Sequence, residues 1–515
     1  MENNKPRAVW NSKIGFLLAA IGSAIGLGNI WRFSYMAFQY GGGAFLIPYV
    51  VAIFIVGIPL MILEFGLGHR EKGSPPLAYA RVSKRWEWLG WWMPILALFG
   101  IMLYYSVVIS WCVNYLYFSI NMAWGANSQD FFFKEFLQRS DSPTDFAGIR
   151  LPIALGAFIV WLTCWFTCYR EVNHGIEKAC MFFMPLLFLL TIILVCWTVQ
   201  LDGAWDAIKN LYLKPDWNQI NFISNPDAAE VWISAFGQIF FTLSLGFGIM
   251  IAYASYLPDK TDIPGNAMWT VGINCFYSFV AGFAVFGIVG FMAAKSGMPF
   301  SEVIKDGPQL AFVVYPEAIR QLPVGQNVFG FLFFLVLILA GLSSGVSLIE
   351  ALSCSLIDKF GFARKRVVTF ICVMGFLGSL IFTTKSGLLI LDITDHYVTS
   401  FGLVIAGLLE CILVGWVLKA SVVRKHINKS GGRHIHVIWD TCVMFITPIF
   451  LLIIVVLSIW DEFRENYGGY ETGDIIVFGL CWVILPVLIG IILSRLKWGS
   501  EQECSQPPLE SNLDH

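Results

Sequence analysis

Neutral oxygen-bearing side chains recur inside long apolar runs of the sequence. The set comprises Asn29, Thr242, Ser244, Asn274, Ser278, Ser343 and Ser344. Asn274 and Ser278 are four residues apart and therefore share one helix face. Each alone is typical of a helical residue bonded to its own backbone, whereas together they offer hard, neutral oxygens to a sodium ion. No Cys/His cluster has the spacing of a soft-metal site.

Charged residues also occur within or at the ends of the apolar runs, at Arg32, Glu64, Asp392 and Asp395. A charge at mid-membrane costs about 2.5–3.5 kcal/mol on insertion scales, so each needs a partner or water. Arg32 and Asp395 are both predicted toward the outer side, where a salt bridge between them would close a gate over a central site. Snorkelling of Arg32 to the interface is the alternative.

The segment GLSSG at 341–345 matches the G-x-S-x-G pattern of serine hydrolases. That pattern belongs to a strand-turn-helix context, whereas this copy lies in a long apolar helical run. The only base near the interior of any apolar run is His396. An intramembrane hydrolase using Ser343 or Ser344 is one alternative to a transport site. An ion channel is another, although nothing in the sequence resembles a repeated selectivity filter.

The elements that position these residues are predicted from composition and run length. The 515 residues are 57% apolar and only 13% charged, which excludes a single soluble domain, where about a quarter of residues are charged. A helix needs roughly 20 apolar residues to cross a bilayer. The sequence predicts an all-α integral membrane protein with twelve transmembrane helices, near 13–34, 43–68, 89–120, 151–169, 179–200, 229–256, 265–293, 325–357, 366–383, 388–418, 436–460 and 473–494.

Twelve spans place both chain ends on one side of the membrane. Basic residues concentrate in connectors on that side, for example Arg70, Lys72, Arg81, Lys84 and Arg85, so the positive-inside rule predicts cytoplasmic termini. The first residues lack a secretory-signal pattern. With a formal net charge of −2 and no long basic tract, no nucleic-acid partner is expected.

Two predicted spans are interrupted by glycines, at Gly22, Gly26 and Gly28 in the first and at Gly246 and Gly248 in the sixth. Glycine costs roughly 1 kcal/mol relative to alanine in a helix, and freed backbone groups at that depth must line a cavity or be buried in protein. Interrupted helices at matching positions of two five-span blocks indicate an inverted-repeat transporter. Close packing at small residues is the alternative.

The predicted organisation follows from these blocks. It comprises an N-terminal cytoplasmic segment with the inner gate (1–12), a first repeat (13–200), a second repeat (229–418), two further spans (436–494) and a polar cytoplasmic tail (495–515). On the outer side, 297–323 is either an external lid or a structured loop.

Four motifs carry a resemblance to a known family: GSAIGLGNIWRF in the first span, GGGAFLIPY at 41–49, GQIFFTLSLGFG at 237–248 and AGLSSG at 340–345. In this order they resemble the neurotransmitter:sodium symporter family, over about residues 10 to 495. The resemblance implies the LeuT-type fold, a 5+5 inverted repeat in which helices 1 and 6 are broken. The 121–150 loop lacks a cysteine pair and so resembles bacterial members, which favours a bacterial inner membrane.

The same resemblance implies two sodium sites. The first would use Ala24, Asn29, Thr242 and Asn274. The second would use the carbonyls of Gly22, Ile25 and Ala340 and the hydroxyls of Ser343 and Ser344. Many eukaryotic members have aspartate where this chain has Ser343.

For the substrate, the resemblance implies a carboxylate bound by backbone N–H groups near Leu27 and Gly28 and by the Tyr105 hydroxyl, beneath Phe241. The implied substrate-binding set is Ser23, Ala24, Leu27, Gly28, Ile101, Tyr105, Phe241, Thr242, Ser244, Phe247, Ser344, Gly345 and Leu348. Gly26 stands where monoamine carriers have an aspartate. Since no member of the set is charged, a neutral zwitterionic amino acid is expected, because an extra buried charge would lack a partner.

The resemblance also implies a chloride site and two gates. Chloride would be held by Tyr49, Gln238, Thr242, Asn274 and Ser278, where chloride-independent relatives have a glutamate in place of Ser278. The implied gates pair Arg32 with Asp395 outside and Arg7 with Asp358 inside, supported by Trp10 and Tyr256. Ser34 departs from the usual proline after the Arg-Phe pair.

The expected function is a secondary transporter, not an enzyme, that couples inward movement of a neutral amino acid to two sodium ions and chloride. Its partners would be this small zwitterion and membrane lipid. A β- or γ-amino acid is the alternative substrate, and the hydrolase is the alternative function.

Overall fold

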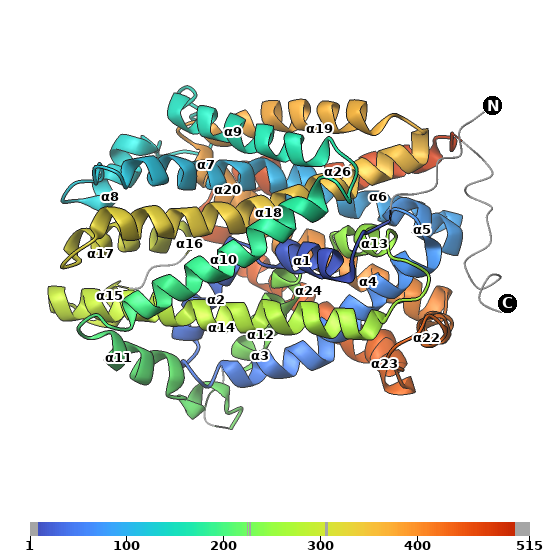
Figure 1. Ribbon diagram of the computed structural model, residues 1–515, viewed down its shortest axis with the longest axis horizontal. Helices are drawn as coiled ribbons and strands as arrows, with labels where there is room; N and C mark the ends of the chain where they lie inside the picture. Colours follow the sequence, from blue (N-terminus) through green and yellow to red (C-terminus); the bar gives the residue numbers. More distant parts are fainter. Residues whose placement is uncertain (1–8, 224, 226–227, 304–306, 500–515) are drawn as a thin grey trace.

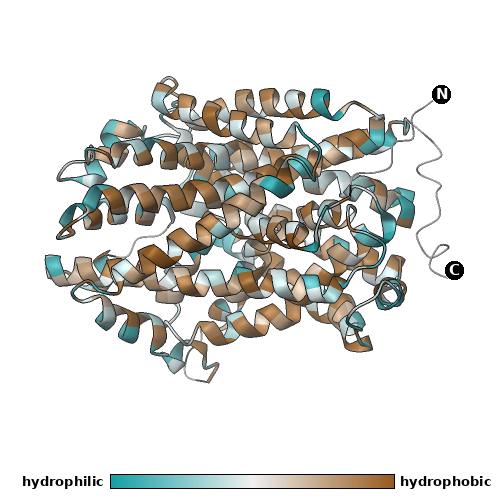
Figure 2. Ribbon diagram, in the orientation of Figure 1, coloured by the Kyte–Doolittle hydropathy of each residue, from teal (hydrophilic) through white to brown (hydrophobic). Residues whose placement is uncertain are grey.

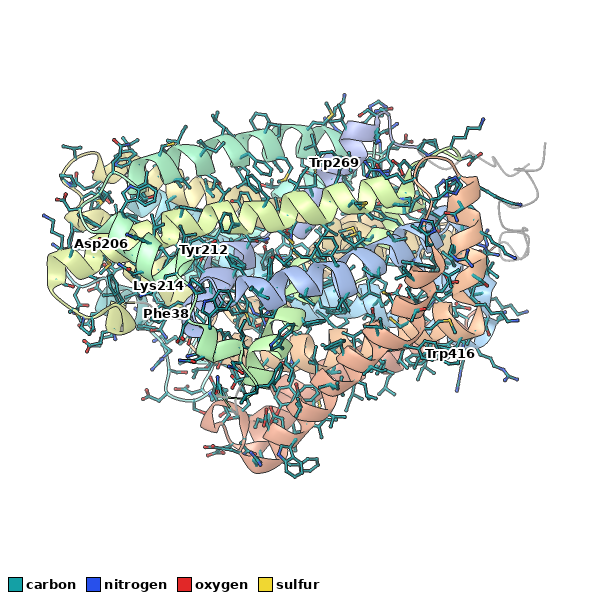
Figure 3. All side chains as sticks on the ribbon, turned by 90° about the horizontal axis from the view of Figure 1, so that it is seen from below. Phe38, Asp206, Tyr212, Lys214, Trp269 and Trp416 are labelled. Carbon is teal, nitrogen blue, oxygen red and sulfur yellow. The ribbon has the colours of Figure 1, made fainter. Side chains whose placement is uncertain are left out.

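The computed structural model describes residues 9–223, 225, 228–303 and 307–499 and is helical throughout that part of the chain (Figure 1). The only β-type pairings recorded there are two isolated bridges. Long helices run roughly along the longest axis, and apolar residues predominate along their lengths (Figure 2). The exposed Trp269 and Trp416 lie on the surface (Figure 3), where tryptophan is typical of a membrane interface.

Five predicted spans make up the first half of the chain. They correspond to α1 (Lys13–Ala24) with η1 (Leu27–Asn29) and α2 (Trp31–Gln39), α3 (Leu46–Ala52) to α4 (Ile58–Glu71), α6 (Glu87–Ile95) to α7 (Leu103–Phe118), α9 (Leu151–Cys168) and α10 (Ile176–Thr198). Short π-helical turns join α3 to α4 and α6 to α7 without ending the helical path.

The second half begins with another interrupted segment. Its elements are α12 (Ala228–Thr242) with α13 (Ile249–Ala254), α14 (Ile263–Ser296), α18 (Gln326–Phe360), α19 (Arg364–Ser379), α20 (Gly387–Tyr397) to α21 (Val404–Ile412), α23 (Val437–Thr441) to α24 (Thr447–Arg464), and η14 (Ile475–Leu480) with α26 (Cys481–Arg495).

Within the described residues, ten helical segments are long and apolar enough to cross a membrane, and α1 with η1 and α2 adds an eleventh as a bent pair. The predicted sixth span is divided into helices of 15 and 6 residues, each shorter than a bilayer crossing. A multispan helical protein is therefore confirmed, while the count of twelve and the inverted repeat stay predictions.

The first interruption lies where the glycines predict it. Helix α1 ends at Ala24, and Ile25 and Gly26 are both extended, with Gly26 at φ −129° and ψ −169°. The chain then re-enters a helix with a bend of 71°. Carbonyls before the break and N–H groups after it are thus released from helical bonding.

The second interruption spans Leu243 to Gly248. Ser244, Gly246 and Gly248 have φ of 53°, 78° and 73°, a left-handed conformation that glycine adopts freely and serine rarely. The Glu64 carboxylate in α4 accepts a hydrogen bond from Gly246 N–H at 2.8 Å. This buried acid therefore satisfies one of the backbone groups that the break exposes.

Short helices close the two ends of the molecule. At one end lie α8 (Ser128–Asp130), α11 (Ala204–Ala207), α15 (Phe300–Val303) and α17 (Tyr315–Gln321), while α16 (Gly307–Gln309) lies further inward (Figure 1). At the other end lie α5 (Pro75–Val82) and α22 (Ala420–Lys429). Trp10 and Trp498, near the limits of the described chain, both pack at this second end, because Trp10 contacts Tyr256 and Trp498 contacts Lys359. We call it the termini-bearing end.

Candidate functional site

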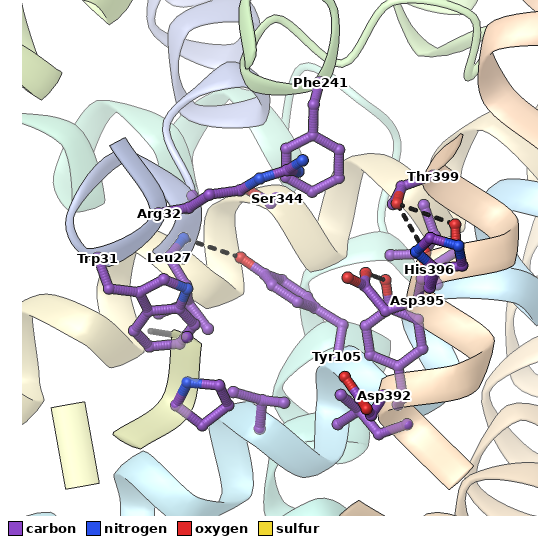
Figure 4. A pocket seen from close by; sticks show the side chains of 18 of the residues that line it. Leu27, Trp31, Arg32, Tyr105, Phe241, Ser344, Asp392, Asp395, His396 and Thr399 are labelled. Atoms are coloured by element: carbon purple, nitrogen blue, oxygen red, sulfur yellow. Dashed lines mark hydrogen bonds between the residues drawn. The ribbon is translucent and has the colours of Figure 1, made fainter. Parts of the chain in front are cut away.

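A cavity of about 580 Å³ joins the two helix breaks to the end of the molecule opposite the termini-bearing end. Its floor includes Ser23 to Asn29, apart from Ile25, and Ser344, and its outer wall includes α16 and the rings of Tyr467 and Tyr470. Figure 4 shows Leu27, Tyr105 and Phe241 around the inner part of this space. The breaks therefore meet at the bottom of one passage.

At the first break, the Ser344 hydroxyl lies among backbone carbonyls. Its Oγ is 3.5 Å from Gly22 O, 3.2 Å from Ser23 O, 3.2 Å from Ile25 O and 3.3 Å from Ala340 O. One hydroxyl has a single hydrogen to donate, so it can bond fully to only one of these carbonyls, while Ser23 O also accepts from the Ser244 hydroxyl at 3.1 Å. The neighbouring Ser343 hydroxyl donates to Ala340 O at 2.9 Å.

Asn29 is the centre of a second polar cluster. Its Nδ2 lies 2.9 Å from Thr242 Oγ1, 2.9 Å from Asn274 Oδ1 and 2.8 Å from Ser278 Oγ. Its Oδ1 accepts from Gly26 N–H at 2.8 Å across the first break. Residues from α12, α14 and the first break thus meet through neutral groups, with Asn274 and Ser278 reaching the cluster from one face of α14.

Two more residues predicted for chloride lie in the same protein interior. Tyr49 is 3% exposed and Gln238 is 0% exposed. The Tyr49 hydroxyl and both polar atoms of the Gln238 amide have no hydrogen-bond partner among the described residues. A buried polar group without a partner costs about 1–3 kcal/mol, and this set comprises two donors, the Tyr49 hydroxyl and Gln238 Nε2, and one acceptor, Gln238 Oε1.

The passage narrows where Tyr105 approaches the first break. Leu27 N–H donates to the Tyr105 hydroxyl at 3.3 Å. A Cβ on Gly26 would lie 3.0 Å from Tyr105 Oη and 3.3 Å from Ser344 Oγ, and one on Gly28 would lie 3.3 Å from Phe241 Cε1. Both glycines therefore leave room that any side chain would fill.

Of the predicted substrate-binding set, one member lies elsewhere. The cavity is lined by Ser23, Ala24, Leu27, Gly28, Ile101, Tyr105, Phe241, Thr242, Ser244, Phe247, Ser344 and Leu348. Gly345 is absent from the lining, and a Cβ there would meet Met102 Cε at 3.0 Å and Cys164 Sγ at 3.6 Å. The structure thus places Gly345 against α9 and the α6–α7 segment because it follows Ser344 on a different face of α18.

At the outer rim, Arg32 and Asp395 both line the cavity but have separate partners. The Arg32 guanidinium lies 4.7 Å from the centroid of the Phe241 ring (Figure 4), and Asp395 accepts from the Tyr104 hydroxyl at 2.5 Å. Among the described residues, no ion pair joins Arg32 to Asp395 in this conformation. The predicted Arg32–Asp395 pair is therefore not formed in this conformation, and its role as a gate stays a prediction.

Tyr104, Tyr467 and Tyr470 line the cavity and are absent from the sequence prediction, which names Asp392 only as a charged residue at the end of an apolar run. Asp392 accepts from the hydroxyls of Tyr467 at 3.1 Å and Tyr470 at 2.9 Å. Burial, with a smaller contribution from Asp392, raises the pKa of Tyr470. Tyr104 is adjacent to the predicted Tyr105, and no local pattern in MLYYSVV separates its role from that of an ordinary buried aromatic residue.

The termini-bearing end is closed. Trp10 Nε1–H donates to Tyr253 O at 2.9 Å, and its ring packs on Tyr253 and Tyr256. Tyr256 in turn donates to Glu350 at 3.0 Å. Asp358 accepts from Ser74 N–H at 2.8 Å, while its predicted partner Arg7 lies outside the described residues.

Neither serine of the GLSSG segment is arranged as a nucleophile. Ser343 and Ser344 donate to backbone carbonyls, and His396 is paired with Glu462 at 2.8 Å. A hydrolase needs a base within hydrogen-bond reach of the hydroxyl, and the hydrogen bonds of these residues give no such pair.

Comparison with known proteins identifies the family. Residues 7–127 and 123–498 match the model of the sodium:neurotransmitter symporter family. The chain belongs to this family. It is 42% identical over 492 residues to an uncharacterized sodium-dependent transporter of Methanocaldococcus jannaschii, covering 95% of this chain and 98% of the relative. It is 31% identical over 541 residues to a sodium-dependent dopamine transporter of Caenorhabditis elegans, covering 94% of this chain and 86% of the relative.

This symporter is thus a sodium-dependent membrane transporter and not an enzyme. The family assignment confirms the resemblance read from the glycine-rich motifs of the first and sixth spans.

Proposed function

We propose that this symporter carries a neutral amino acid together with two sodium ions and chloride. The observation that carries the proposal is the convergence of neutral oxygens on the two helix breaks at the bottom of a passage open at one end. A small substrate in that position contacts both breaks at once and can therefore influence their geometry.

Both sodium sites would use oxygens that the breaks release. In the second site, the carbonyls around Ser344 Oγ, at 3.2–3.5 Å, would close on the ion as the hydroxyl turns its hydrogen away. In the first, Asn29, Thr242 and Asn274 would contribute side-chain oxygens next to the Ala24 carbonyl. Neutral hard oxygens of this kind suit a sodium ion better than a soft metal.

Chloride is supported by the unpaired donors. Tyr49 Oη and Gln238 Nε2 are buried hydrogen-bond donors without a partner among described residues, and Ser278 Oγ belongs to the adjoining Asn29 cluster. An anion there would accept from these groups and offset the charge of the nearby cation.

The substrate would bring its own carboxylate. Residue 26 is a glycine, so the protein supplies no aspartate at this point, and a Cβ there would already lie 3.0 Å from Tyr105 Oη. The N–H groups following the first break would instead bind the carboxylate of the substrate. Ile101, Phe247 and Leu348 line the cavity as apolar groups, which favours a neutral side chain.

Transport would follow from movement of spans 1, 2, 6 and 7 against the other helices. The open rim at Arg32 and Asp395 and the closed contacts of Trp10 support an assignment of this conformation as outward-facing. The protein would then lie in the cell inner membrane with its termini in the cytoplasm.

Uptake by the purified protein in liposomes tests the proposal. A pool of labelled neutral amino acids is offered under a sodium gradient, with chloride or gluconate outside. We expect accumulation that requires sodium and falls in gluconate. Sodium-dependent uptake that is indifferent to chloride would refute the anion site, and accumulation of β- or γ-amino acids alone would refute the substrate class.

A further inference from the structure

Two histidines from distant parts of the chain meet at the termini-bearing end. His69, in the last turns of α4, and His426, in α22, are 357 residues apart in sequence, and their Nδ1 and Nε2 atoms are 2.9 Å apart. Both side chains are 0% exposed. Such burial is typical of a histidine whose ring nitrogens are paired.

The hydrogen-bond partners determine the tautomers of this pair. His69 Nε2 lies 2.9 Å from the carbonyl oxygen of Pro258, which can only accept, so His69 Nε2 carries a hydrogen. In the neutral ring, His69 Nδ1 must then accept from His426 Nε2–H. The remaining nitrogen, His426 Nδ1, is buried and has no partner among the described residues.

The hydrogen bonds from His426 to His69 and from His69 to Pro258 leave no acceptor for an additional proton. A hydrogen added to His426 Nδ1 would be a buried donor with no acceptor among the described residues. If both rings were fully protonated, the N–H groups at His69 Nδ1 and His426 Nε2 would point at each other, with their nitrogens 2.9 Å apart. Burial is the main reason that the pKa of His426 is lowered to about 3, and the nearby cations lower it further.

The charges facing the pair come from every element packed around it. Arg70 and Lys72 lie on or just after α4, and Lys429 lies on α22. Arg70 is ion-paired with Glu71, and Lys72 is 3.3 Å from Asp259. On the far side of α22, Arg424 is paired with Asp440 of α23 at 3.0 Å. The acids are therefore bound to these cations rather than placed to accept from His426.

The pair joins two parts of the molecule that transport would move apart. His69 directly follows the second predicted span and lies in α4, and Pro258 links α13 to α14, so both belong to the proposed moving group of spans 1, 2, 6 and 7. His426 belongs to the connection between α21 and α23, outside that group. Further contacts reinforce this junction, because Thr261 N–H donates to Ser430 O at 2.9 Å and Arg433 N–H donates to Asp262 at 3.0 Å.

The helices also approach closely beside the histidines. A Cβ on Gly66 would lie 2.7 Å from Ile427 Cδ1 and 3.0 Å from Val423 Cγ1. This contact puts α22 directly on α4, so proton access to His426 requires α22 to separate from α4.

We propose that the His69–His426 pair is a proton-sensitive latch that holds the termini-bearing end closed and opens when that side becomes acidic. The role of this latch in transport rests on the proposed function, whereas its response to protons does not. The neutral pair stabilises contact between α22 and α4, while the separated histidines are free to bind protons.

The direction of the pH effect follows from linkage. Because the latched state resists protonation, its stability is fully present above the ordinary histidine pKa of about 6.5 and is lost as the pH falls below it. For one proton taken up on opening, lowering the pH from 7.5 to 5.5 increases the open population about tenfold.

Hydrogen exchange of the full chain in lipid nanodiscs, without substrate or a sodium gradient, tests this inference. Amide exchange in 66–72 and 420–430 is compared at pH 7.5 and 5.5 after correction for the intrinsic pH dependence of exchange. We expect at least tenfold faster corrected exchange at pH 5.5. An unchanged rate in the wild-type chain would overturn the latch, whatever the outcome of the uptake experiment.

Two variants make the test specific. His69→Gln with His426→Gln keeps donors and acceptors of similar reach but cannot take up a proton, so its corrected exchange should not depend on pH. His434→Gln with His436→Gln changes two exposed histidines of the same connection and should respond as the wild type does. A persistent response in the first variant, or its loss in the second, would also overturn the assignment.

Discussion

At the scale of single residues, the proposed site has a small residue and a neutral one at two positions, Gly26 and Ser278. Gly26 leaves the floor of the cavity open beneath Tyr105, and Ser278 contributes a hydroxyl to the Asn29 cluster. The charge balance at the breaks therefore depends on the ions and the substrate rather than on the protein. Two substitutions test this dependence separately.

Gly26→Ala should weaken substrate binding. Its Cβ would lie 3.0 Å from Tyr105 Oη, and overpacking of this kind costs about 1–3 kcal/mol, which corresponds to roughly a 5- to 150-fold rise in KM for sodium-driven uptake. Gly345→Ala is the matched control, because its Cβ would also approach an atom at 3.0 Å, Met102 Cε, but away from the cavity. Equal effects of the two substitutions would contradict the proposed substrate position.

Ser278→Glu should remove the chloride requirement of uptake, because the carboxylate would supply the negative charge within the Asn29 cluster. We expect the ratio of uptake rates in gluconate and in chloride to rise to about one. Ser278→Gln is of similar size and neutral, and should not become independent of chloride. If the glutamate variant still needs chloride, the anion site lies elsewhere.

At the scale of elements, the N-terminal end of α1 is fixed by an acid from another helix. Glu177 of α10 accepts from Asn11 N–H at 2.9 Å and from the Ser12 hydroxyl at 2.9 Å, while Ser12 caps α1 by accepting from Gly15 N–H. A Cβ on Gly15 would lie 2.1 Å from Glu177 Oε1. The glycine therefore leaves the space that the Glu177 side chain occupies against the start of α1.

Gly15→Ala should displace Glu177 and loosen the start of α1. Losing a helix cap costs about 1 kcal/mol, so amide exchange in residues 13–18 should rise about fivefold. Gly272→Ala is the control, because a Cβ on this exposed helical glycine meets no atom within 4 Å. Equal exchange rates in Gly15→Ala and the wild type would show that α1 does not depend on this contact.

The elements also show what can be inferred from sequence. Run length predicts the long helices, and glycine spacing predicts both breaks, because these signals are local. The left-handed Ser244 within the second break, the Tyr104–Asp395 bond and the His69–His426 pair are not predicted. Each depends on tertiary packing or on a partner far along the chain. The sequence predicts Gly345 in the cavity, whereas the structure places it outside the lining. The motif gives the position of a residue along α18 but not the direction that the residue faces.

At the scale of the whole molecule, access to the site is one-sided. The cavity reaches the rim at Arg32 and Asp395, whereas Trp10, Tyr253 and Tyr256 pack together at the other end. The gate pair does not form in this conformation because Phe241 and Tyr104 hold its two members. The predicted pair would therefore form only if both contacts were exchanged.

Thiol labelling tests this one-sided access. In a background with the exposed Cys196 and Cys481 replaced by serine, Thr399→Cys, in the cavity lining, should react with an impermeant reagent in sodium. Bound substrate should slow that reaction about tenfold by favouring closure. Ser347→Cys, at a buried position, should stay unreactive. Labelling of the second cysteine but not the first would contradict the outward-facing assignment.

The placement of charge along the cavity has a consequence for voltage. The charged lining residues Arg32, Arg139, Asp392 and Asp395 belong to its outer part, and the floor at the two breaks is formed by neutral groups. In the proposed cycle, two sodium ions, one chloride and a zwitterion carry one net positive charge, worth about 2.3 kcal/mol per 100 mV. The membrane potential would therefore drive the loaded protein inward, while the return of the empty protein would generate almost no current and proceed at the same rate in resting and depolarised membranes.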